Sequence, residues 1–201
     1  MFHVKQFSEK TIQNLKKYEN LLQKWQKKIN LVSTPTLADA WNRHFLDSAQ
    51  LWEHIPKGAE ILADFGSGAG FPGLVLAIIA DGEGVKLDVH LIESDTRKCV
   101  FLSEVARSCC VSVHIHEGRI EKTKPFVADV VTARALKDTK TLLTYVKPFV
   151  SEKTTALFLK GEKVREEWDE ALSIVSAQAE FIQSQTDKSG TILKLSELKY
   201  L

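Results

Sequence analysis

The amino-acid sequence predicts an α/β protein in which a mostly parallel sheet is covered by helices on both faces. Three observations support this. The apolar run Ile61–Phe65 leads directly into a glycine-rich loop and a second apolar run, a pattern typical of a strand, a tight turn and a helix. Beyond the loop, strand-like and helix-like runs alternate, as in βαβ units. Two later strand-like runs flank Thr186–Gly190, which resembles a hairpin turn and predicts an antiparallel C-terminal strand pair.

The N-terminal part predicts two amphipathic helices. Ser8 suits an N-cap, and the apolar residues that follow recur near the helical period with lysines between them. Asn30–Pro35 interrupts this pattern, and a second helix is predicted over Thr36–Trp52. Two helices are too small to enclose a core of their own. We therefore expect residues 1–58 to form a helical extension packed on a domain of residues 59–201.

The remaining predicted elements follow in alternation. Strands are expected at Glu60–Phe65, Leu87–Glu93, Ser112–His116, Ala128–Thr132 and Thr154–Leu159. Helices are expected at Phe71–Ala80, Thr96–Cys110, Thr139–Val146 and Glu162–Ala177. The strand-like runs of the terminal pair are Glu180–Gln185 and Ile192–Leu195.

Composition places the chain among ordinary globular proteins, with 44% hydrophobic and 26% charged residues. The formal net charge of +1 hides an asymmetry, because residues 1–30 contain seven lysines and only two acidic residues. The three cysteines have no metal-ligand spacing and suit a reducing compartment, so we expect a cytoplasmic protein. No apolar stretch is long enough to span a bilayer, and no membrane partner is expected.

The glycine-rich loop is the strongest candidate for a ligand site. Gly68–Gly73 matches the GxGxxG pattern of dinucleotide-binding loops. However, the Asp64 carboxylate at the strand end repels a pyrophosphate, and Pro72 removes an N–H that a phosphate needs. S-adenosylmethionine fits better, because it is cationic and has no phosphate. Glu93 ends the next strand, where an acid can accept hydrogen bonds from ribose hydroxyls of either cofactor.

Several segments together resemble the bacterial RsmG (GidB) family of ribosomal RNA methyltransferases. Asp64–Gly73 is similar to the DxGxGxGxPG signature of that family. The order of the other motifs also agrees, namely Lys24–Leu31 with KWxKxxNL, Arg43–Ser48 with RHxLDS, Phe101–Val105 with FLxxV, then Ala133–Ala135 and Leu159–Gly161. The resemblance covers about residues 22–161 and implies a Rossmann-like class I methyltransferase fold with S-adenosylmethionine as cofactor.

The resemblance also implies a reaction and a set of site residues. The family installs 7-methylguanine in small-subunit (16S) ribosomal RNA, which implies guanine 527 as the target. Gly66 and Phe71 are implied to lie against the cofactor, Ile120 and Glu121 to flank its adenine, and Arg134 to border the site. With Asp64, Gly68 and Glu93 from the loop analysis, these residues form the expected cofactor site.

The chemistry of guanine N7 sets few demands on catalytic residues. Methyl transfer is an in-line displacement that depends on near-attack geometry, and N7 already offers a lone pair, so no general base is required. Arg134 is a candidate for positioning the purine, because a guanidinium can make charge-assisted hydrogen bonds to guanine. The candidate RNA contacts are Lys24, Lys27, Lys28, Arg43 and His44.

Other interpretations remain open at this stage. A nicotinamide-dependent oxidoreductase would also use a GxGxxG loop, and a non-catalytic RNA-binding or ribosome assembly factor would keep the fold without turnover. His44 and Asp47 share a helix face and suit a structural pair as well as an RNA contact. His114 and His116 alternate on a strand without a third ligand nearby in sequence, so no metal is expected. We expect a monomer whose partner is small-subunit ribosomal RNA or a ribosomal particle.

Overall fold

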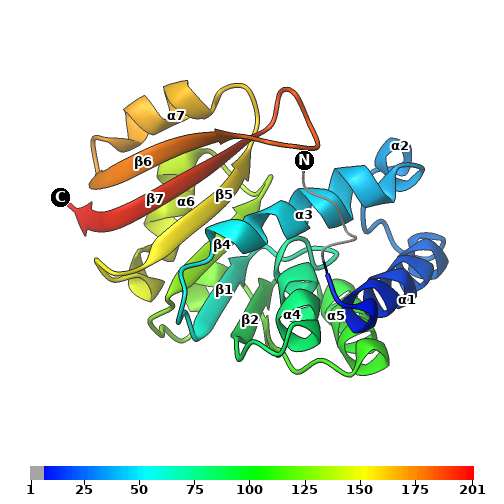
Figure 1. Cartoon of the computed structure of the whole chain (residues 1–201). Coiled ribbons are helices and arrows are strands. Elements are labelled where there is room, and N and C mark those ends of the chain that lie inside the picture. The colour runs from blue at the N-terminus through cyan, green and yellow to red at the C-terminus, as the bar shows by residue number, and fades with distance from the viewer. Residues whose placement is uncertain (1–6) are drawn as a thin grey trace.

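A seven-stranded sheet with the strand order β3-β2-β1-β4-β5-β7-β6 forms the centre of the computed structural model, which describes residues 7–201 (Figure 1). The five parallel strands are β1 (Ile61–Phe65), β2 (Asp88–Glu93), β3 (His114–Glu117), β4 (Val130–Arg134) and β5 (Thr155–Lys160). The last two strands are β6 (Val175–Gln183) and β7 (Thr191–Tyr200), and β7 runs antiparallel to both of its neighbours, β5 and β6. The predicted fold class is confirmed. Residues 1–6, the start of the predicted extension, lie outside the described residues.

Strand order reverses beside β1, which pairs with β2 on one side and with β4 on the other. The parallel strands β2 and β3 therefore lie on one side of β1, and β4 and β5 lie on the other. In open α/β sheets this switch point leaves a crevice at the carboxyl ends of the strands, where ligands bind. The loops after β1 and β4 lie at this crevice.

Helices cover both faces of the sheet. On one face lie α1 (Glu9–Gln26), α4 (Gly73–Gly82) and α5 (Thr96–Cys109), and on the other lie α6 (Thr139–Val146) and α7 (Val164–Ala171) (Figure 1). Short 3-10 turns, η4 (Ile120–Lys122) and η5 (Lys147–Phe149), follow β3 and α6. No helix within residues 7–201 combines the length and the apolar character needed to cross a membrane.

Helix α4 explains why an N-terminal helix packs on the core. Every residue from Gly73 to Ala80 is buried, and a helix that is apolar all round must be covered on the side away from the sheet. Helix α1 supplies this cover. It begins at the predicted N-cap Ser8, whose side chain accepts a hydrogen bond from the Thr11 N–H. Its apolar stripe buries Leu15, Tyr18 and Leu22 against α4 and α5.

The second predicted helix, Thr36–Trp52, is divided into four short pieces. Helix α2 (Thr34–Leu37) is followed by a π-helical segment η2 (Trp41–Leu46), then α3 (Asp47–Ala49) and a 3-10 segment η3 (Gln50–His54). The wider turns of a π-helix commonly occur at functional sites. In this chain η2 carries Arg43 and His44.

The prediction of a helix over Glu162–Ala177 is wrong beyond Ala171, where α7 ends. Residues Val175–Gln183 form β6 instead. The apolar residues Val175, Ala177, Ala179 and Phe181 pack on the core at every second position, which is the period of a strand. The terminal pair is consequently longer than predicted, and its turn contacts the segment η2–α3.

Candidate functional site

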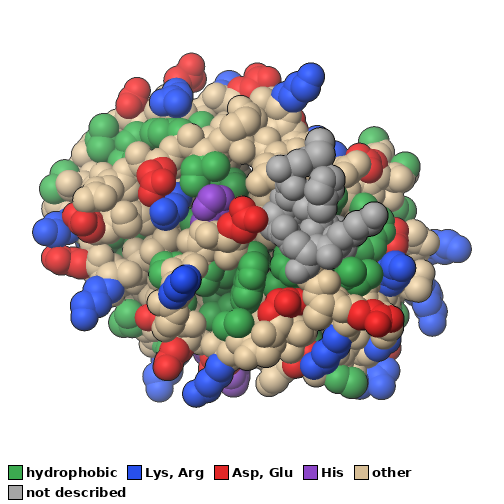
Figure 2. All heavy atoms as spheres, in the orientation of Figure 1, with side chains coloured by type: hydrophobic (Ala, Val, Ile, Leu, Met, Phe, Trp, Pro, Cys, Tyr) green, Lys and Arg blue, Asp and Glu red, His purple; other side chains and the backbone are tan. Residues whose placement is uncertain are grey.

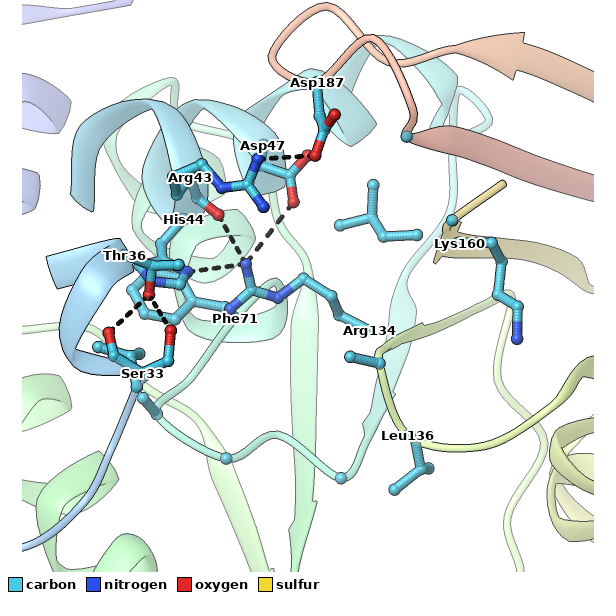
Figure 3. Close-up of a pocket in the computed structure, with 18 of the residues that line it drawn as sticks. Ser33, Thr36, Arg43, His44, Asp47, Phe71, Arg134, Leu136, Lys160 and Asp187 are labelled. Atoms are coloured by element: carbon cyan, nitrogen blue, oxygen red, sulfur yellow. Dashed lines mark hydrogen bonds and ion pairs between the residues drawn. The ribbon is translucent and has the colours of Figure 1, made fainter. Parts of the chain in front are cut away.

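A cavity of about 730 Å³ opens at the carboxyl ends of the central strands. Its size falls within the range of about 300–1,000 Å³ that is typical of small-molecule sites. Several parts of the chain line it, as Figure 3 shows in close-up. The main ones are the glycine loop after β1, the loop after β4, the end of β5, and a wall built from η2 and the β6–β7 turn, and Leu31–Ser33 and Thr36 also line it.

The glycine loop adopts a conformation that requires glycine. Gly66, Gly68 and Gly70 have φ values of 66°, 58° and 94°, which ordinary side chains disfavour. At Gly66 space is also limiting, because an added Cβ would lie 2.6 Å from Leu136 Cδ1. The loop turns back onto β2, with the N–H groups of Gly66 and Ser67 donating to the Ile92 carbonyl at 2.9 and 3.1 Å.

Glu93 fixes the same loop to the end of β2. Its Oε2 accepts a hydrogen bond from the Gly68 N–H and its Oε1 accepts one from the Asp95 N–H, both at 2.8 Å. Asp95 in turn caps α5. The carboxylate therefore holds the glycine loop and the start of α5 together at the strand end.

Tyr18 of α1 supports the loop from the other side. Its hydroxyl donates a hydrogen bond to the Ala69 carbonyl, and its ring stacks on Phe71 with centroids 5.3 Å apart. Burial raises the pKa of this hydroxyl, so it remains a donor. The N-terminal helix thus shapes the loop directly.

Asp64 is fully buried behind the loop and does not line the cavity. Thr132 Oγ1 donates to Asp64 Oδ1 at 2.8 Å, whereas Oδ2 lacks a hydrogen-bond partner among the described residues. Burial raises the pKa of this carboxyl to about 6, although hydrogen bonds from Thr132 and Ser67 oppose the rise. Because the group is enclosed, its charge acts on the cavity through the protein interior rather than by contact.

Arg134, the last residue of β4, connects the sheet with the N-terminal helices. Its Nη1 donates to the Arg43 carbonyl and to His44 Nδ1, both at 2.9 Å, and lies 3.6 Å from Asp47 Oδ2 (Figure 3). The guanidinium also lies over the Phe71 ring, 5.0 Å from its centroid, which is cation–π range. The His44 ring stacks on Phe71 as well.

These contacts fix the protonation of His44. An arginine can only donate, so His44 Nδ1 accepts from Arg134, and Nε2 carries the proton and donates to Thr36 Oγ1 at 2.9 Å. Burial, together with the charges of Arg134 and Arg43, lowers the pKa of His44 to about 3. The imidazole is therefore neutral at physiological pH.

The β6–β7 turn is attached to the same helical segment. Arg43 Nη1 forms an ion pair with Asp187 Oδ2 at 2.7 Å, and Thr186 Oγ1 donates to Asp47 Oδ1 at 2.9 Å. Gln50 adds a hydrogen bond to Ser184. Burial raises the pKa of the Asp47 carboxyl, while Arg134 lowers it. Segments far apart in sequence thus close one wall of the cavity.

The family model for rRNA small subunit methyltransferase G (GidB) matches residues 11–193. The chain belongs to the GidB family.

Curated relatives and solved structures agree with this assignment. The ribosomal RNA small subunit methyltransferase G of Rhodospirillum centenum is 46% identical over 95% of this chain and 86% of its own length. That of Gluconobacter oxydans is 45% identical over 96% of both chains. A TehB-like SAM-dependent methyltransferase from Corynebacterium glutamicum has the same fold, with a TM-score of 0.61, 14% identity, and coverage of 91% of this chain and 99% of its own.

Membership of the GidB family confirms the predicted methyltransferase fold, the enzyme class and S-adenosylmethionine as cofactor. The nicotinamide-dependent and non-catalytic interpretations are not favoured. The cavity suits this cofactor, because Gly66 and Gly68 line it without side chains and the shape of the loop is fixed by N–H donation to the Ile92 carbonyl and the Glu93 carboxylate.

The structure brings only some of the sequence-predicted site residues together in the GidB cavity. Those that line it are Gly66, Gly68, Phe71, Arg43, His44 and Arg134. Ile120 is buried and Glu121 exposed in the turn after β3, and neither lines the cavity. The lysines 24, 27 and 28 are exposed at and just after the end of α1. Figure 2 shows both basic and acidic side chains on the lower right of the molecule, where Figure 1 has α1 and α5. The segment that follows these lysines, Leu31–Ser33, reaches the cavity rim.

Sequence analysis did not identify Leu136, Lys160 or Asp187 as site residues. Lys160 ends β5, and its Nζ pairs with Glu167 at 2.6 Å and donates to the Lys137 carbonyl at 2.7 Å. Its place at the carboxyl end of a central strand was an available signal. Asp187 had no comparable signal, because its turn reads as an ordinary hairpin and its partner Arg43 lies 144 residues away.

Proposed function

We propose that this chain transfers a methyl group from S-adenosylmethionine to N7 of a guanine in small-subunit (16S) ribosomal RNA. The observation that carries the proposal is the state of the acid and base groups around the cavity. Each lining carboxylate and the one lining imidazole among the described residues already has partners. Such a site suits a nucleophile that brings its own lone pair and gives up no proton.

The partners are specific. His44 Nδ1 is occupied by Arg134, and Asp47 accepts from Thr186 and Gln50. The other lining carboxylates are Asp138, which caps α6 through the Thr141 N–H, Glu167, which pairs with Lys160, and Asp187, which pairs with Arg43. These contacts lower the pKa values of Asp138, Glu167 and Asp187. A lowered pKa makes a carboxylate a weaker base, so these three groups are poorly suited to take a proton from a methyl acceptor.

The cofactor, when bound, supplies a methyl group on a positively charged sulfonium. Gly66, Gly68 and Phe71 provide the surface that holds it at the carboxyl end of β1. We assign Glu93, Ile120 and Glu121 to its nucleoside end, because they lie at or beyond the carboxyl ends of β2 and β3. The buried carboxyl of Asp64 favours positive charge in the cavity.

Arg134 is assigned to the RNA side of the reaction. Its guanidinium lies over the Phe71 ring and its Nη1 is tied to η2, which leaves the N–H groups of Nε and Nη2 as donors for a ligand in the cavity that Arg134 lines. A fixed donor of this kind can position a guanine through O6, and positioning is the main requirement of an in-line displacement. His44 and Asp47 act as positioning residues for Arg134. The exposed lysines 24, 27 and 28, at and just after the end of α1, are assigned to RNA phosphates.

The experiment compares 16S ribosomal RNA from cells with and without the gene, using chemical cleavage specific for 7-methylguanine. We expect one cleavage to be lost, at guanine 527 as the family resemblance implies, and to return with the wild-type gene. Restoration by Arg134→Ala to the wild-type level would contradict the role of Arg134, and an unchanged pattern in the deletion would contradict the substrate.

We further propose that the enzyme acts as a monomer in the cytoplasm. In support, residues of the N-terminal helices, the central strands and the C-terminal hairpin meet in one cavity within a single chain. Light scattering of the purified protein during size-exclusion chromatography tests the monomeric state. A stable dimer that loses methyl transfer when it dissociates would contradict it.

A further inference from the structure

A second cluster of polar side chains lies at the opposite end of the sheet from the cavity. Asp88 begins β2 and His90 follows two residues later, so both side chains lie on the same face. His114 pairs directly with His90 across the β2–β3 ladder, and His116 lies two residues further along β3. The sheet register thus adds two possible ligands, Asp88 and His90, to the two histidines that sequence alone showed.

The distances within this cluster suit a metal ion. His114 Nε2 lies 2.9 Å from Asp88 Oδ1, and His90 Nε2 lies 3.6 Å from Asp88 Oδ2. One ligand atom from each of the three residues lies within 4.8 Å of the other two. Zinc bonds to nitrogen and oxygen measure about 2.0–2.2 Å, so tetrahedral ligand atoms stand about 3.4 Å apart. The two separations, which go to different oxygens of Asp88, lie on either side of that value.

The imidazole of His90 also has the orientation expected of a metal ligand. Its Nδ1 lies 2.9 Å from His116 Nε2, and a ligating histidine characteristically uses its second nitrogen in such a hydrogen bond. Phe126 packs on the His90 ring with centroids 4.3 Å apart, and the His114 ring stacks at 4.6 Å. These contacts hold the His90 ring so that Nε2 faces Asp88.

The cluster is either a metal site or an ordinary polar pair, depending on which of His90 and His116 donates the proton in the hydrogen bond between them. If His90 Nδ1–H donates to His116, the bare lone pair of His90 Nε2 faces a carboxylate, an arrangement that a cation between them stabilises. If His116 donates instead, His90 Nε2–H points toward Asp88, and the two side chains form an ordinary polar pair on β2. Metal binding distinguishes the two.

We propose that Asp88, His90 and His114 bind a divalent transition-metal ion, with zinc as the best match to two imidazoles and one carboxylate. The ion joins the edge strand β3 to β2, and solvent completes its coordination because Asp88 and His114 are exposed. It lies at the amino ends of these strands, away from the cavity, so its role is structural. This differs from the sequence-based expectation of no metal, and it is independent of the proposed methyl transfer.

The test is calorimetric titration of the full-length, tag-free protein with zinc chloride. A Cys110→Ser background removes the one exposed thiol. We expect one ion per chain, a raised melting temperature, and at least a tenfold loss of affinity in His90→Ala and in His114→Ala. His54→Ala, which alters a histidine at the end of η3, is the matched control and should bind as the parent does.

His116 separates a metal site from a surface histidine pair. His116→Leu removes the acceptor for His90 Nδ1–H and should weaken zinc binding by about 10- to 100-fold, whereas His116→Gln keeps a carbonyl acceptor and should restore part of it. Circular dichroism shows whether each variant is folded. No zinc binding by the folded parent, or equal binding by the folded His90→Ala and His114→Ala variants, would overturn the proposal.

Discussion

Replacing Gly66 by alanine tests how the cavity is built. An alanine at φ 66° is strained by about 1–2 kcal/mol wherever it occurs. At Gly66 its Cβ must also displace Leu136, since the two would lie 2.6 Å apart. Leu136 lines the cavity, so this displacement changes the space that the cofactor occupies.

In the free protein the end of the Leu136 side chain can move aside at little cost, but a bound cofactor is expected to fill the space into which it moves. The overpacking cost of about 1–3 kcal/mol for an added methyl group then falls on the complex. Because about 1.4 kcal/mol corresponds to a tenfold change in a dissociation constant, S-adenosylmethionine should bind about 5- to 150-fold more weakly. The matched control is Gly84→Ala. Gly84 has nearly the same φ, 69°, but nothing lies within 4 Å of the added Cβ.

The assay is calorimetric titration with S-adenosylmethionine, together with thermal unfolding. Both variants should lose a similar amount of stability from the backbone strain, and only Gly66→Ala should lose affinity. Adding Leu136→Ala to Gly66→Ala removes the obstructing side chain and should recover most of the binding. Equal affinities of the Gly66→Ala and Gly84→Ala variants, or no recovery in the double variant, would refute this explanation.

Three further predictions concern the wall of the cavity and the lysines at the end of α1. The folded-state pKa of His44, about 3, lies below its usual 6.5, so the contribution of neutral His44 to stability is complete above about pH 6.5 and is lost as the pH falls toward 3. Between pH 7.5 and pH 5, denaturant unfolding should show a larger loss of unfolding free energy for the wild type than for His44→Gln, and equal losses would be contrary evidence. Arg43→Gln breaks a partly exposed ion pair with Asp187 and should change the free energy of unfolding by less than about 1 kcal/mol, yet raise the KM for RNA severalfold in a methyl-transfer assay. Asp187→Asn keeps the cation and should raise this KM less. An unchanged KM in Arg43→Gln would exclude an RNA contact of Arg43. Combined alanine substitution of the lysines at 24, 27 and 28 should make the slope of log K for RNA binding against log [salt] less steep by about 2–3. The same change at the exposed lysines 122, 124 and 153 should leave the slope unchanged. Equal slopes for the two triple variants would contradict the assignment of lysines 24, 27 and 28 to RNA phosphates.

The sequence predicted those parts of the site that depend on local backbone geometry. Gly66 and Gly68, which line the cavity, were recognisable because positive φ demands glycine. Glu93 was correctly placed at the end of the next strand, where it holds the glycine loop, and its contact with the cofactor stays a prediction. Asp64 was correctly placed at the end of β1, but its complete burial behind the loop depends on the surrounding helices, which no local pattern reveals.

Contacts between distant segments could not be predicted in the same way. Leu136 limits the space at Gly66, and Asp187 meets Arg43, only because the fold brings separate segments to one wall. The start of β6 was missed for a different reason. Small residues such as Ala177 and Ala179 suit a helix by propensity, and their alternation acquires meaning only when β7 pairs beside them.

The wall that joins η2 to the β6–β7 turn also sets when the enzyme becomes complete during its own synthesis. Arg43 and Asp187 are separated by 144 residues, and at about 5–20 residues per second a ribosome needs roughly 7–30 s to make the intervening chain. The glycine loop is made early in this interval, but the turn that closes the cavity comes near its end. A growing chain therefore cannot present the finished cavity to the ribosomal RNA around it until synthesis is almost over.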